Sequence, residues 1–534
     1  MASLFNEKAL EEAIMSLFEK NGFQHFCGEE IHKEKTEFLL VEDLKKYLLS
    51  TYDISVNESN MIIKYLKSFE KYPIYEANKK ISDLVSNGFI FKRENPDDKD
   101  LHINLINYND EEINRNIFKI VNQIEYEENH LRIPDGVIYI NGIPLVVLEF
   151  KSAINENTTV YNAYEQLTIR YKRDIPTIFK YNSFCIISDG VNSKMGSFFS
   201  DYEFFYSWRR TSEETKEKDG IDSLHTMISG LFNKQRLLNV IRNFIYFPDV
   251  TQKEIKIVCR YPQFYAANML HKSIKSNMKP VGNGKGGTYF GATGSGKSYT
   301  MLYLTRLLMK DIELKNPTII LITDRTDLDD QLSKTFENAT EYIGDKLIKK
   351  IETRSELKKT LEETTSGGVY LTTIQKFCED FNLLSNRNNI ICISDEAHRS
   401  QTNTEKTYKI TDEQVKVKYG FAKYLHDSLP NATYVGFTGT PIDATMDVFG
   451  DIIDSYTMKD SVSDEITVNI TYEGRAAKVL LDDEKIKEYI ELIPYFILYS
   501  KNRQGFNFWT ASFTAWRTCV WLCRKNEKSK FCKT

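Results

Sequence analysis

The order of hydrophobic and polar positions along the chain predicts where helices and strands form. Residues 7–20 have the apolar spacing of an amphipathic helix. Between residues 121 and 190, short apolar runs are broken by turn signals, which predicts a small sheet inside a mixed α/β domain. From about residue 255, apolar strands alternate with helical segments, and this predicts a parallel sheet with crossover helices. The predicted fold class is therefore α/β throughout.

A polar, highly charged stretch at 211–222 lacks apolar periodicity and predicts a connection between two domains, although a long surface loop would have the same pattern. The predicted division is a first domain at 1–215, a connection at 216–255, a second domain at 256–470, the start of a further connection at 471–492 and a tail at 493–534.

Composition narrows the class of protein. A chain of 534 residues is too long for one hydrophobic core and predicts about three domains. The net charge of -5 excludes a globally basic nucleic-acid binder but leaves room for local basic channels. No signal peptide and no membrane-spanning apolar run are evident, and the eight cysteines are scattered without a CxxC pair. We expect a cytoplasmic protein with reduced thiols and no membrane partner.

The octet GATGSGKS follows the apolar run GTYF and precedes an amphipathic helix, which is the context that a phosphate-binding loop requires. Glycines let backbone N–H groups turn toward the phosphates, and the helix N-terminus adds positive potential. Lys297 is expected to reach the β- and γ-phosphates of ATP, and the Ser298 hydroxyl to bind Mg²⁺. The predicted nucleotide-binding residues here are Gly291, Thr293, Gly294, Gly296, Lys297 and Ser298.

A second motif, DEAH, ends the apolar strand NIICIS about a hundred residues downstream. Asp395 is placed to bind Mg²⁺, and Glu396 to polarise the water that attacks the γ-phosphate. His398 is a candidate for coupling the nucleotide to later motifs, with a surface imidazole as the alternative. A lone DEAH on a helix is more often solvated surface, but its place after a buried strand favours the catalytic interpretation.

These motifs resemble those of helicase-like motors of superfamily two, whose ATP-binding domain is RecA-like. Thr323–Leu332 and Thr372–Phe377 resemble motifs that contact the tracking strand, GFTGTP resembles the motif that couples hydrolysis to movement, and Arg260–Leu270 resembles an adenine-reading segment. A buried glutamine is an equal alternative for the last of these. The resemblance implies DNA-contact or coupling roles for Arg325, Thr372, Gln375, His398, Thr438 and Thr440, and an adenine contact for Gln263.

Upstream of the motor-like region, residues 132–151 resemble the PD-(D/E)xK nuclease signature. Asp135 and Glu149 are the two carboxylates expected to hold Mg²⁺ against the scissile phosphate, and Lys151 is expected to orient the attacking water. Glu149 and Lys151 are two apart on a strand and so share a face. The alternative is a hairpin with charged ends.

The turn of this hairpin decides whether the three groups meet. A two-residue turn would leave Asp135 opposite Leu148, on the face away from Glu149. A three-residue loop pairs Tyr139 with Ile143 instead, and brings the charged groups to one face while the other becomes nearly all apolar. We therefore predict the three-residue loop.

A nuclease of this kind before such a motor resembles the restriction (R) subunit of type I restriction–modification enzymes, over about residues 1–490. A third nuclease motif, a Gln followed by an aromatic residue, matches Gln166 and Tyr171, but their spacing of five rather than four favours Gln166. The resemblance implies an ATP- and Mg²⁺-dependent endonuclease. It would translocate on duplex DNA, cleave both strands, join methyltransferase and specificity subunits, and leave recognition of the DNA sequence to another subunit.

Two other functions remain as alternatives. One is a type III-like or repair helicase–nuclease, although the N-terminal place of the nuclease argues against type III. The other is a non-catalytic remnant that binds ATP and DNA.

The tail differs from the rest of the chain, because no acidic residue lies between Glu491 and Glu527 and three of four tryptophans gather there. We interpret it as out-of-frame translation after a frameshift, which would truncate the subunit before a second RecA-like domain and leave the isolated chain inactive as a motor. A divergent apolar helix is the alternative. A metal site at Cys519, Cys523 and Cys532 is disfavoured, since no fourth ligand is evident.

Overall fold

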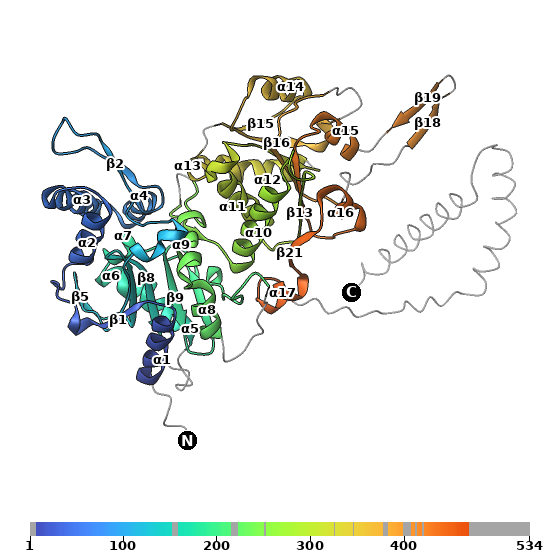
Figure 1. The fold of residues 1–534 in the computed structure, drawn as a ribbon. Helices are drawn as coiled ribbons and strands as arrows, with labels where there is room; N and C mark the ends of the chain where they lie inside the picture. Colours follow the sequence, from blue (N-terminus) through green and yellow to red (C-terminus); the bar gives the residue numbers. More distant parts are fainter. Residues whose placement is uncertain are drawn as a thin grey trace, which may run out of the picture. The chain divides into compact units, whose positions relative to one another are not determined.

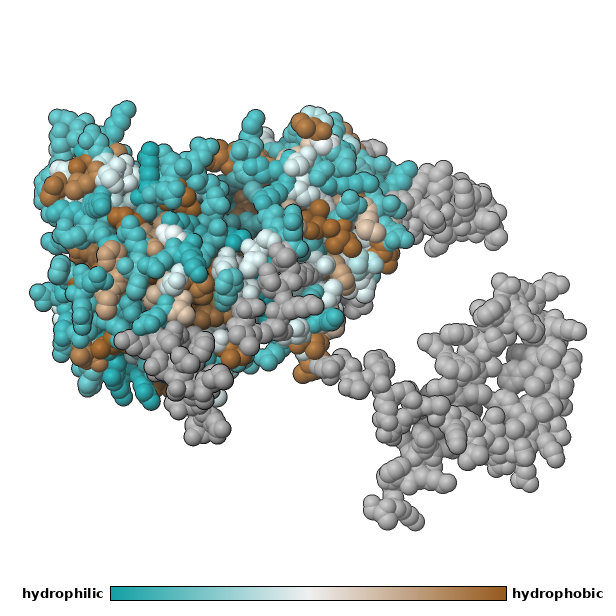
Figure 2. Space-filling view, turned by 60° about the horizontal axis from the view of Figure 1, so that its bottom comes forward, coloured by the Kyte–Doolittle hydropathy of each residue, from teal (hydrophilic) through white to brown (hydrophobic). Residues whose placement is uncertain are grey.

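The computed structural model describes residues 7–468 except for residues 152–158, 215–222, 250–252, 325, 345–346, 378–382, 399–406, 412–413 and 419–420 (Figure 1). The predicted further connection at 471–492, the predicted out-of-frame tail and its three cysteines lie outside these residues. No helix in the described part is both long and apolar enough to cross a bilayer. Hydrophilic residues predominate on the face shown in Figure 2, with apolar residues in small separate groups.

The N-terminal region is built on a six-stranded mixed sheet in the order β1-β4-β7-β8-β9-β10. Its strands are β1 (Gln24–Cys27), β4 (Phe118–Asn122), β7 (Gly136–Ile140), β8 (Ile143–Phe150), β9 (Phe184–Ser188) and β10 (Ser193–Gly196). The pairs β1–β4 and β8–β9 are parallel and the others antiparallel. Every residue of β7, β8 and β9 is buried, so these near-continuous apolar runs form the centre of the sheet.

Helices and short hairpins surround this sheet. They are α1 (Glu7–Lys20), α2 (Val41–Thr51), α3 (Val56–Ser68), α4 (Ile74–Asn87), α5 (Val160–Glu165), the π-helix η4 (Gln166–Tyr171), α6 (Lys172–Asp174), α7 (Ile178–Tyr181), and the strand pairs β2 (Phe89–Phe91) with β3 (Leu101–Ile103) and β5 (Tyr126–Glu127) with β6 (Leu131–Arg132). A capping box starts α3, because the Ser55 hydroxyl accepts from Glu58 N at 3.0 Å and the Glu58 carboxylate accepts from Ser55 N at 2.9 Å.

The β7–β8 hairpin has a two-residue turn, so the predicted three-residue loop is wrong. Ile140 pairs with Ile143, and Asn141 and Gly142 both have positive φ, at 50° and 79°. Such values are required by the tight turns that match the twist of antiparallel strands. The Asn141 side chain stabilises this backbone, since its carbonyl oxygen accepts from Ile117 N at 2.7 Å.

A β-bulge in β8 corrects the register that this turn would otherwise impose. Tyr139 pairs with Pro144 while Ile138 pairs with Val146, so Leu145 is the extra residue. Gly136 then lies opposite Leu148. The residue before Gly136 therefore comes to the position of Glu149, and the expected convergence is reached by a bulge in the strand rather than by a longer loop.

The predicted connection at 216–255 is folded over most of its described length. It contains α8 (Ser223–Leu231) and α9 (Lys234–Asn243), and its strand β11 (Ile245–Tyr246) pairs with β12 (Ile257–Val258). Apolar residues of both helices are buried in the core that the N-terminal region shares with the following region. The stretch thus packs as part of the protein core and is not a simple linker.

Residues 208–210 join the N-terminal region to the second sheet. Trp208 packs on aromatic rings of the following helix, with 5.5 Å between its ring centroid and that of Phe264. Arg210 is 3% exposed and its guanidinium lies 3.0 Å from the carboxylate of Asp454. Arg209 pairs with Asp464 at 2.9 Å. The two regions cannot separate here without leaving a buried charge unpaired, and this cost opposes opening of the junction.

Lys256 is a buried lysine at the same junction. It is 1% exposed, and its ammonium donates to Asn78 Oδ1 at 2.9 Å and to Asn182 O at 2.6 Å. Burial lowers the pKa of Lys256 from its ordinary 10.5 to about 7. The residue therefore attaches the chain before β12 to the N-terminal region through hydrogen bonds rather than through an ion pair.

Stability should rise with pH because of Lys256. Between pH 7 and 10.5 the unfolded chain binds a proton that the folded chain does not, so in this window the folded state gains stability as pH increases. We expect the melting temperature of the natural chain to rise between pH 7 and pH 9 relative to that of Lys256→Met. The exposed Lys253→Met is the control, and an unchanged difference between the natural chain and Lys256→Met would contradict the assignment.

The second region is a seven-stranded sheet in the order β15-β16-β14-β17-β20-β13-β21, with every pair parallel. This confirms the predicted parallel sheet. The strands are β13 (Lys285–Gly291), β14 (Thr318–Thr323), β15 (Ile348–Lys350), β16 (Val369–Thr373), β17 (Ile390–Ser394), β20 (Thr433–Thr438) and β21 (Ile452–Tyr456). Strands β17, β20 and β13 are neighbours, so the segments that follow them meet at one edge of the sheet.

Crossover helices and a hairpin complete this region (Figure 1). They are α10 (Tyr261–Asn277), α11 (Lys297–Lys310), α12 (Thr326–Glu337), α13 (Thr340–Ile343), α14 (Arg354–Glu363), α15 (Phe421–Ser428), α16 (Asp443–Phe449), α17 (Met458–Ser463) and the hairpin β18 (Thr407–Thr411) with β19 (Gln414–Lys418). Pro262 stands in the first turn of α10, where its missing N–H costs no helical hydrogen bond.

Candidate functional site

The first candidate site lies at the open end of the β7–β8 hairpin. Asp135 precedes β7, Glu149 lies in β8, and Lys151 follows it. The Phe150 N–H donates to Asp135 Oδ2 at 2.6 Å, and the Lys151 ammonium donates to Glu149 Oε1 at 2.7 Å. The structure thus brings together the three residues that the sequence pattern selected.

Glu149 has unusual electrostatics. Its side chain has no exposed surface, and burial together with the charge of Asp135 raises the pKa of Glu149 to about 8, although Lys151 and Tyr171 oppose the shift. Two close carboxylates with one cation beside them are suited to a hard divalent cation, which prefers oxygen ligands. The pair fits Mg²⁺, with Asp135 and Glu149 as the residues that would hold it. The described residues contain no cluster of three or more His, Cys, Asp or Glu side chains that would hold a metal.

Tyr171 belongs to this site, and the sequence pattern undervalued it. Its hydroxyl donates to Glu149 Oε2 at 2.9 Å and accepts from Gln166 Nε2 at 2.9 Å. The spacing of five is explained by the π-helix η4, in which residues five apart, rather than four apart, share a face. The spacing of five residues is the only sign of this arrangement in the sequence. In an α-helix the same spacing would put Tyr171 on a different face from Gln166, which is why the sequence favoured Gln166 alone.

The second candidate site is the loop between β13 and α11. Gly294 and Gly296 have φ of 80° and 84°, values that an L-residue adopts only with strain. An added Cβ at Gly296 would lie 2.7 Å from Gln263 Nε2, so only glycine fits there. The Lys297 ammonium donates to Gly291 O at 3.2 Å and lies 4.0 Å from Glu396 Oε1. Thr293 and Ser298 stand on the same loop and on the first turn of α11.

The segments after β17 and β20 lie against this loop. Asp395 follows β17 directly, and Oδ1 of its carboxylate accepts from Glu396 N at 2.9 Å. Glu396 has a positive φ of 47°, a conformation that non-glycine residues rarely adopt outside sites that need it. A Cβ added to Gly439, after β20, would lie 3.3 Å from Thr293 Oγ1 and 3.7 Å from Lys297 Nζ.

His398 links the two segments. Its Nδ1 lies 2.8 Å from Thr438 Oγ1 and 3.4 Å from a Glu396 carboxylate oxygen. The Thr440 N–H donates to the same Thr438 hydroxyl at 3.1 Å. A continuous polar path therefore runs from Glu396 to the segment that follows β20, which is the arrangement expected for a coupling histidine.

Gln263 lies beside the phosphate-binding loop, in the wall of a cavity of about 710 Å³. Gln263 Nε2 donates to Gly296 O at 3.4 Å, and its Oε1 accepts from Arg260 N at 2.9 Å. The Arg260 guanidinium donates to Ser295 O. Arg260 was not among the predicted site residues, since an arginine before a helix gives no distinctive signal.

The predicted DNA-contact residues lie in different environments. Thr372 has no exposed surface and its hydroxyl has no partner among the described residues, and its contact with DNA stays a prediction. Thr372 is buried because it lies within β16, whose residues are all buried. Gln375 is exposed in the turn that follows, and its amide donates to Asp324 O at 2.7 Å. Arg325 lies outside the described residues.

Comparisons with known proteins agree with the two-region organisation. Residues 4–204 match the family described as type I restriction enzyme R protein N terminus, and residues 262–496 match the SWI2/SNF2 ATPase family. The chain is 33% identical over 495 residues to the type I restriction enzyme HindI endonuclease subunit of Haemophilus influenzae, covering 88% of this chain and 46% of that relative. It thus spans about half the length of the curated relatives it matches.

Two solved structures show weaker likeness. The ATP-dependent type ISP restriction-modification enzyme LlaBIII bound to DNA has a TM-score of 0.28 at 17% identity, with 42% of this chain and 17% of that chain covered. The SWI2/SNF2 ATPase core of Sulfolobus solfataricus in complex with dsDNA has a TM-score of 0.25 at 16% identity, with 38% and 35% covered. The two family matches, in this order, and the identity to the HindI subunit show that the chain belongs to the R subunits of type I restriction enzymes.

Proposed function

We propose that this chain cleaves DNA in a type I restriction enzyme and couples that cleavage to ATP hydrolysis. The observation that carries the proposal is the meeting of Asp135, Glu149 and Lys151 at one end of a buried hairpin, in a chain that also has a phosphate-binding loop. Duplex DNA would be the substrate, and methyltransferase and specificity subunits would be the partners, as the family implies.

Asp135 and Glu149 would hold Mg²⁺ at the nuclease site. When bound, the ion supplies Lewis-acid stabilisation of the phosphate and a more acidic water. Lys151 lies 2.7 Å from Glu149, where its charge can orient the attacking water and offset the negative charge that develops on the phosphate. Tyr171 and Gln166 hold the Glu149 carboxylate in place by hydrogen bonds.

ATP would bind at the phosphate-binding loop, with Lys297 on the β- and γ-phosphates and Ser298 and Asp395 toward Mg²⁺. Glu396 would orient the attacking water, and His398 would report the state of the nucleotide to Thr438 and the segment after it. Gln263 and the cavity beside it would receive the adenine base. The remaining proposed DNA-contact or coupling residues are Arg325, Thr372, Gln375 and Thr440.

The test is to separate the two activities with one substitution at each site. Glu149→Ala should abolish cleavage and leave ATP hydrolysis intact. Lys297→Ala should weaken ATP binding, remove ATP hydrolysis and, because cleavage depends on the motor, remove ATP-dependent cleavage as well. Loss of ATP hydrolysis in Glu149→Ala, with the protein folded, would contradict the assignment of two separate sites.

Tyr171→Phe should slow cleavage roughly tenfold, because one hydrogen bond to a charged group is lost. That hydrogen bond lowers the pKa of Glu149, so its loss should raise this pKa further. Mg²⁺ binds ionised Glu149, so Tyr171→Phe should need a higher Mg²⁺ concentration for half-maximal cleavage. Tyr164→Phe, which loses only a hydroxyl hydrogen-bonded to Ser200 O, is the control. An unchanged Mg²⁺ dependence in Tyr171→Phe would contradict the role.

A further inference from the structure

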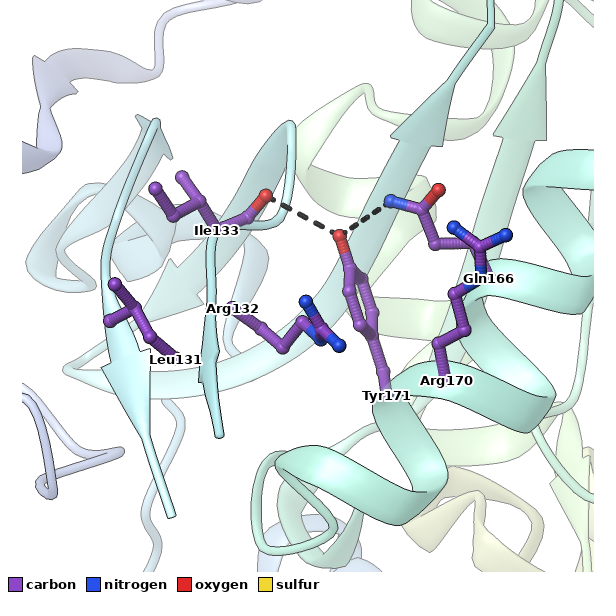
Figure 3. Close-up of a pocket in the computed structure, with 6 residues that line it drawn as sticks. All are labelled: Leu131, Arg132, Ile133, Gln166, Arg170 and Tyr171. Carbon is purple, nitrogen blue, oxygen red and sulfur yellow. Dashed lines mark hydrogen bonds between the residues drawn. The ribbon is translucent and has the colours of Figure 1, made fainter. Parts of the chain in front are cut away.

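A recess of about 240 Å³ adjoins the carboxylate cluster (Figure 3). It is lined by Leu131, Arg132, Ile133, Gln166, Arg170 and Tyr171. The Tyr171 hydroxyl donates to Glu149 Oε2 at 2.9 Å and lies 3.3 Å from Ile133 O, so this tyrosine forms the wall between the recess and the carboxylates. Whatever occupies the recess is therefore next to the reacting atoms.

Two arginines face this recess from different elements. Figure 3 shows Arg132 of β6 on one side of the Tyr171 ring and Arg170 of η4 on the other, beside Gln166. No carboxylate is among the six lining residues. The recess therefore has a positive lining without an anion of its own.

Arg132 is held in position by a buried carboxylate. Its Nε donates to Asp174 Oδ2 at 2.6 Å, and its Nη2 lies 2.6 Å from the same oxygen. Asp174 has no exposed surface, and hydrogen bonds from Arg173 and Arg132 keep its pKa below the usual range, so it stays ionised. Nη1 of Arg132 has no partner within the described residues and remains for a ligand.

Arg170 has a different environment. It is exposed, and in the part of the chain that the structure describes its guanidinium has no hydrogen-bond or ion-pair partner. Its place follows from η4, because the wider turn carries Arg170 beside Tyr171 while Gln166 stays in reach of the Tyr171 hydroxyl. A planar guanidinium matches two oxygens of a phosphate or carboxylate.

We propose that this recess binds the DNA phosphodiester next to the scissile one, with Arg170 and Arg132 donating to its oxygens. The inference rests on the proposed nuclease function and adds a positioning site to it. The recess is small, which suits one phosphodiester with the edge of its sugar rather than a base pair. The apolar side chains of Leu131 and Ile133 would face the sugar. Neither arginine would take part in bond breaking.

The test uses Arg170, which is exposed, so its replacement leaves the fold intact. With Ca²⁺ in place of Mg²⁺ to prevent cleavage, binding of a short duplex DNA is measured as a function of salt concentration. Arg170→Ala should weaken binding roughly tenfold and lower the slope of log K against log salt by about 0.9, the value for one lost phosphate contact. Arg170→Lys should restore the slope.

Lys172→Ala is the matched control, since Lys172 is exposed and its loss removes the same charge from the neighbouring surface but not from the recess. Equal effects of Arg170→Ala and Lys172→Ala on affinity, slope and single-turnover cleavage would overturn the proposal. Glu149→Ala distinguishes failure of the phosphate site from failure of the proposed nuclease function. If Glu149→Ala cleaves DNA normally, the nuclease assignment is wrong. If Glu149→Ala is inactive and Arg170→Ala is unaffected, only the phosphate site is wrong.

Discussion

Glu149→Ala is expected to abolish Mg²⁺-dependent DNA cleavage, with a rate loss of roughly 10³-fold or more. The substitution removes one of two carboxylates at the site and leaves the Lys151 ammonium without its partner at 2.7 Å. Both losses act at the atoms where charge develops in the reaction. The measurement is single-turnover cleavage of plasmid DNA by the assembled restriction complex at saturating Mg²⁺ and ATP.

Glu127→Ala is the control for this experiment, because Glu127 is an exposed glutamate on β5 in the same region. ATP hydrolysis by the Glu149 variant should equal that of the natural protein, since the phosphate-binding loop is built on another sheet. Cleavage at a normal rate by Glu149→Ala would remove this residue, and with it the cluster, from the proposed mechanism.

Lys297→Ala is expected to weaken ATP binding by roughly 10²-fold and to remove ATP hydrolysis. The Lys297 ammonium is the positive charge at this loop. It donates a hydrogen bond to Gly291 O and lies 4.0 Å from Glu396 Oε1. Without it, the phosphates of ATP lose a charged donor that backbone N–H groups cannot replace. Calorimetric titration with ATP and Mg²⁺ measures the affinity directly.

Lys310→Ala serves as the matched control, because Lys310 is at the opposite end of α11 from the loop. The affinity of the Lys310→Ala protein for ATP should equal that of the natural protein. If Lys297→Ala binds ATP as tightly as Lys310→Ala does, the loop after β13 is not the nucleotide site.

The grouping of the motifs proposed to bind ATP could be predicted from the sequence because each of them follows an apolar strand. Parallel strands present their carboxyl ends at one edge of a sheet, so Lys297, Asp395 and Thr438 had to meet if the strands were neighbours. The sequence could not tell whether Thr372 lies at the edge of the sheet or within a strand, because a threonine near a strand end is compatible with both; the structure places it within β16.

The meeting of the three residues of the candidate nuclease site could be predicted from the sequence, but the backbone that brings them together could not. Apolar alternation required Asp135 and Glu149 to share a face, yet it could not distinguish a longer turn from a bulge at Leu145, since both shift the register by one residue. The α-helical period favours Gln166 over Tyr171, whereas the backbone at this place forms a π-helix. A single β-bulge or π-turn hardly changes the hydrophobic periodicity of a sequence.

The junction at residues 208–210 has a mechanical consequence. Arg210 is paired with Asp454 of β21, and Asp454 lies beside Tyr289 of β13, the strand that leads into the phosphate-binding loop. A force applied to the second sheet would therefore reach the N-terminal region through two adjacent strands and a buried ion pair. Such a connection is stiffer than a flexible linker, so a displacement of one sheet would be passed to the other instead of being lost between them.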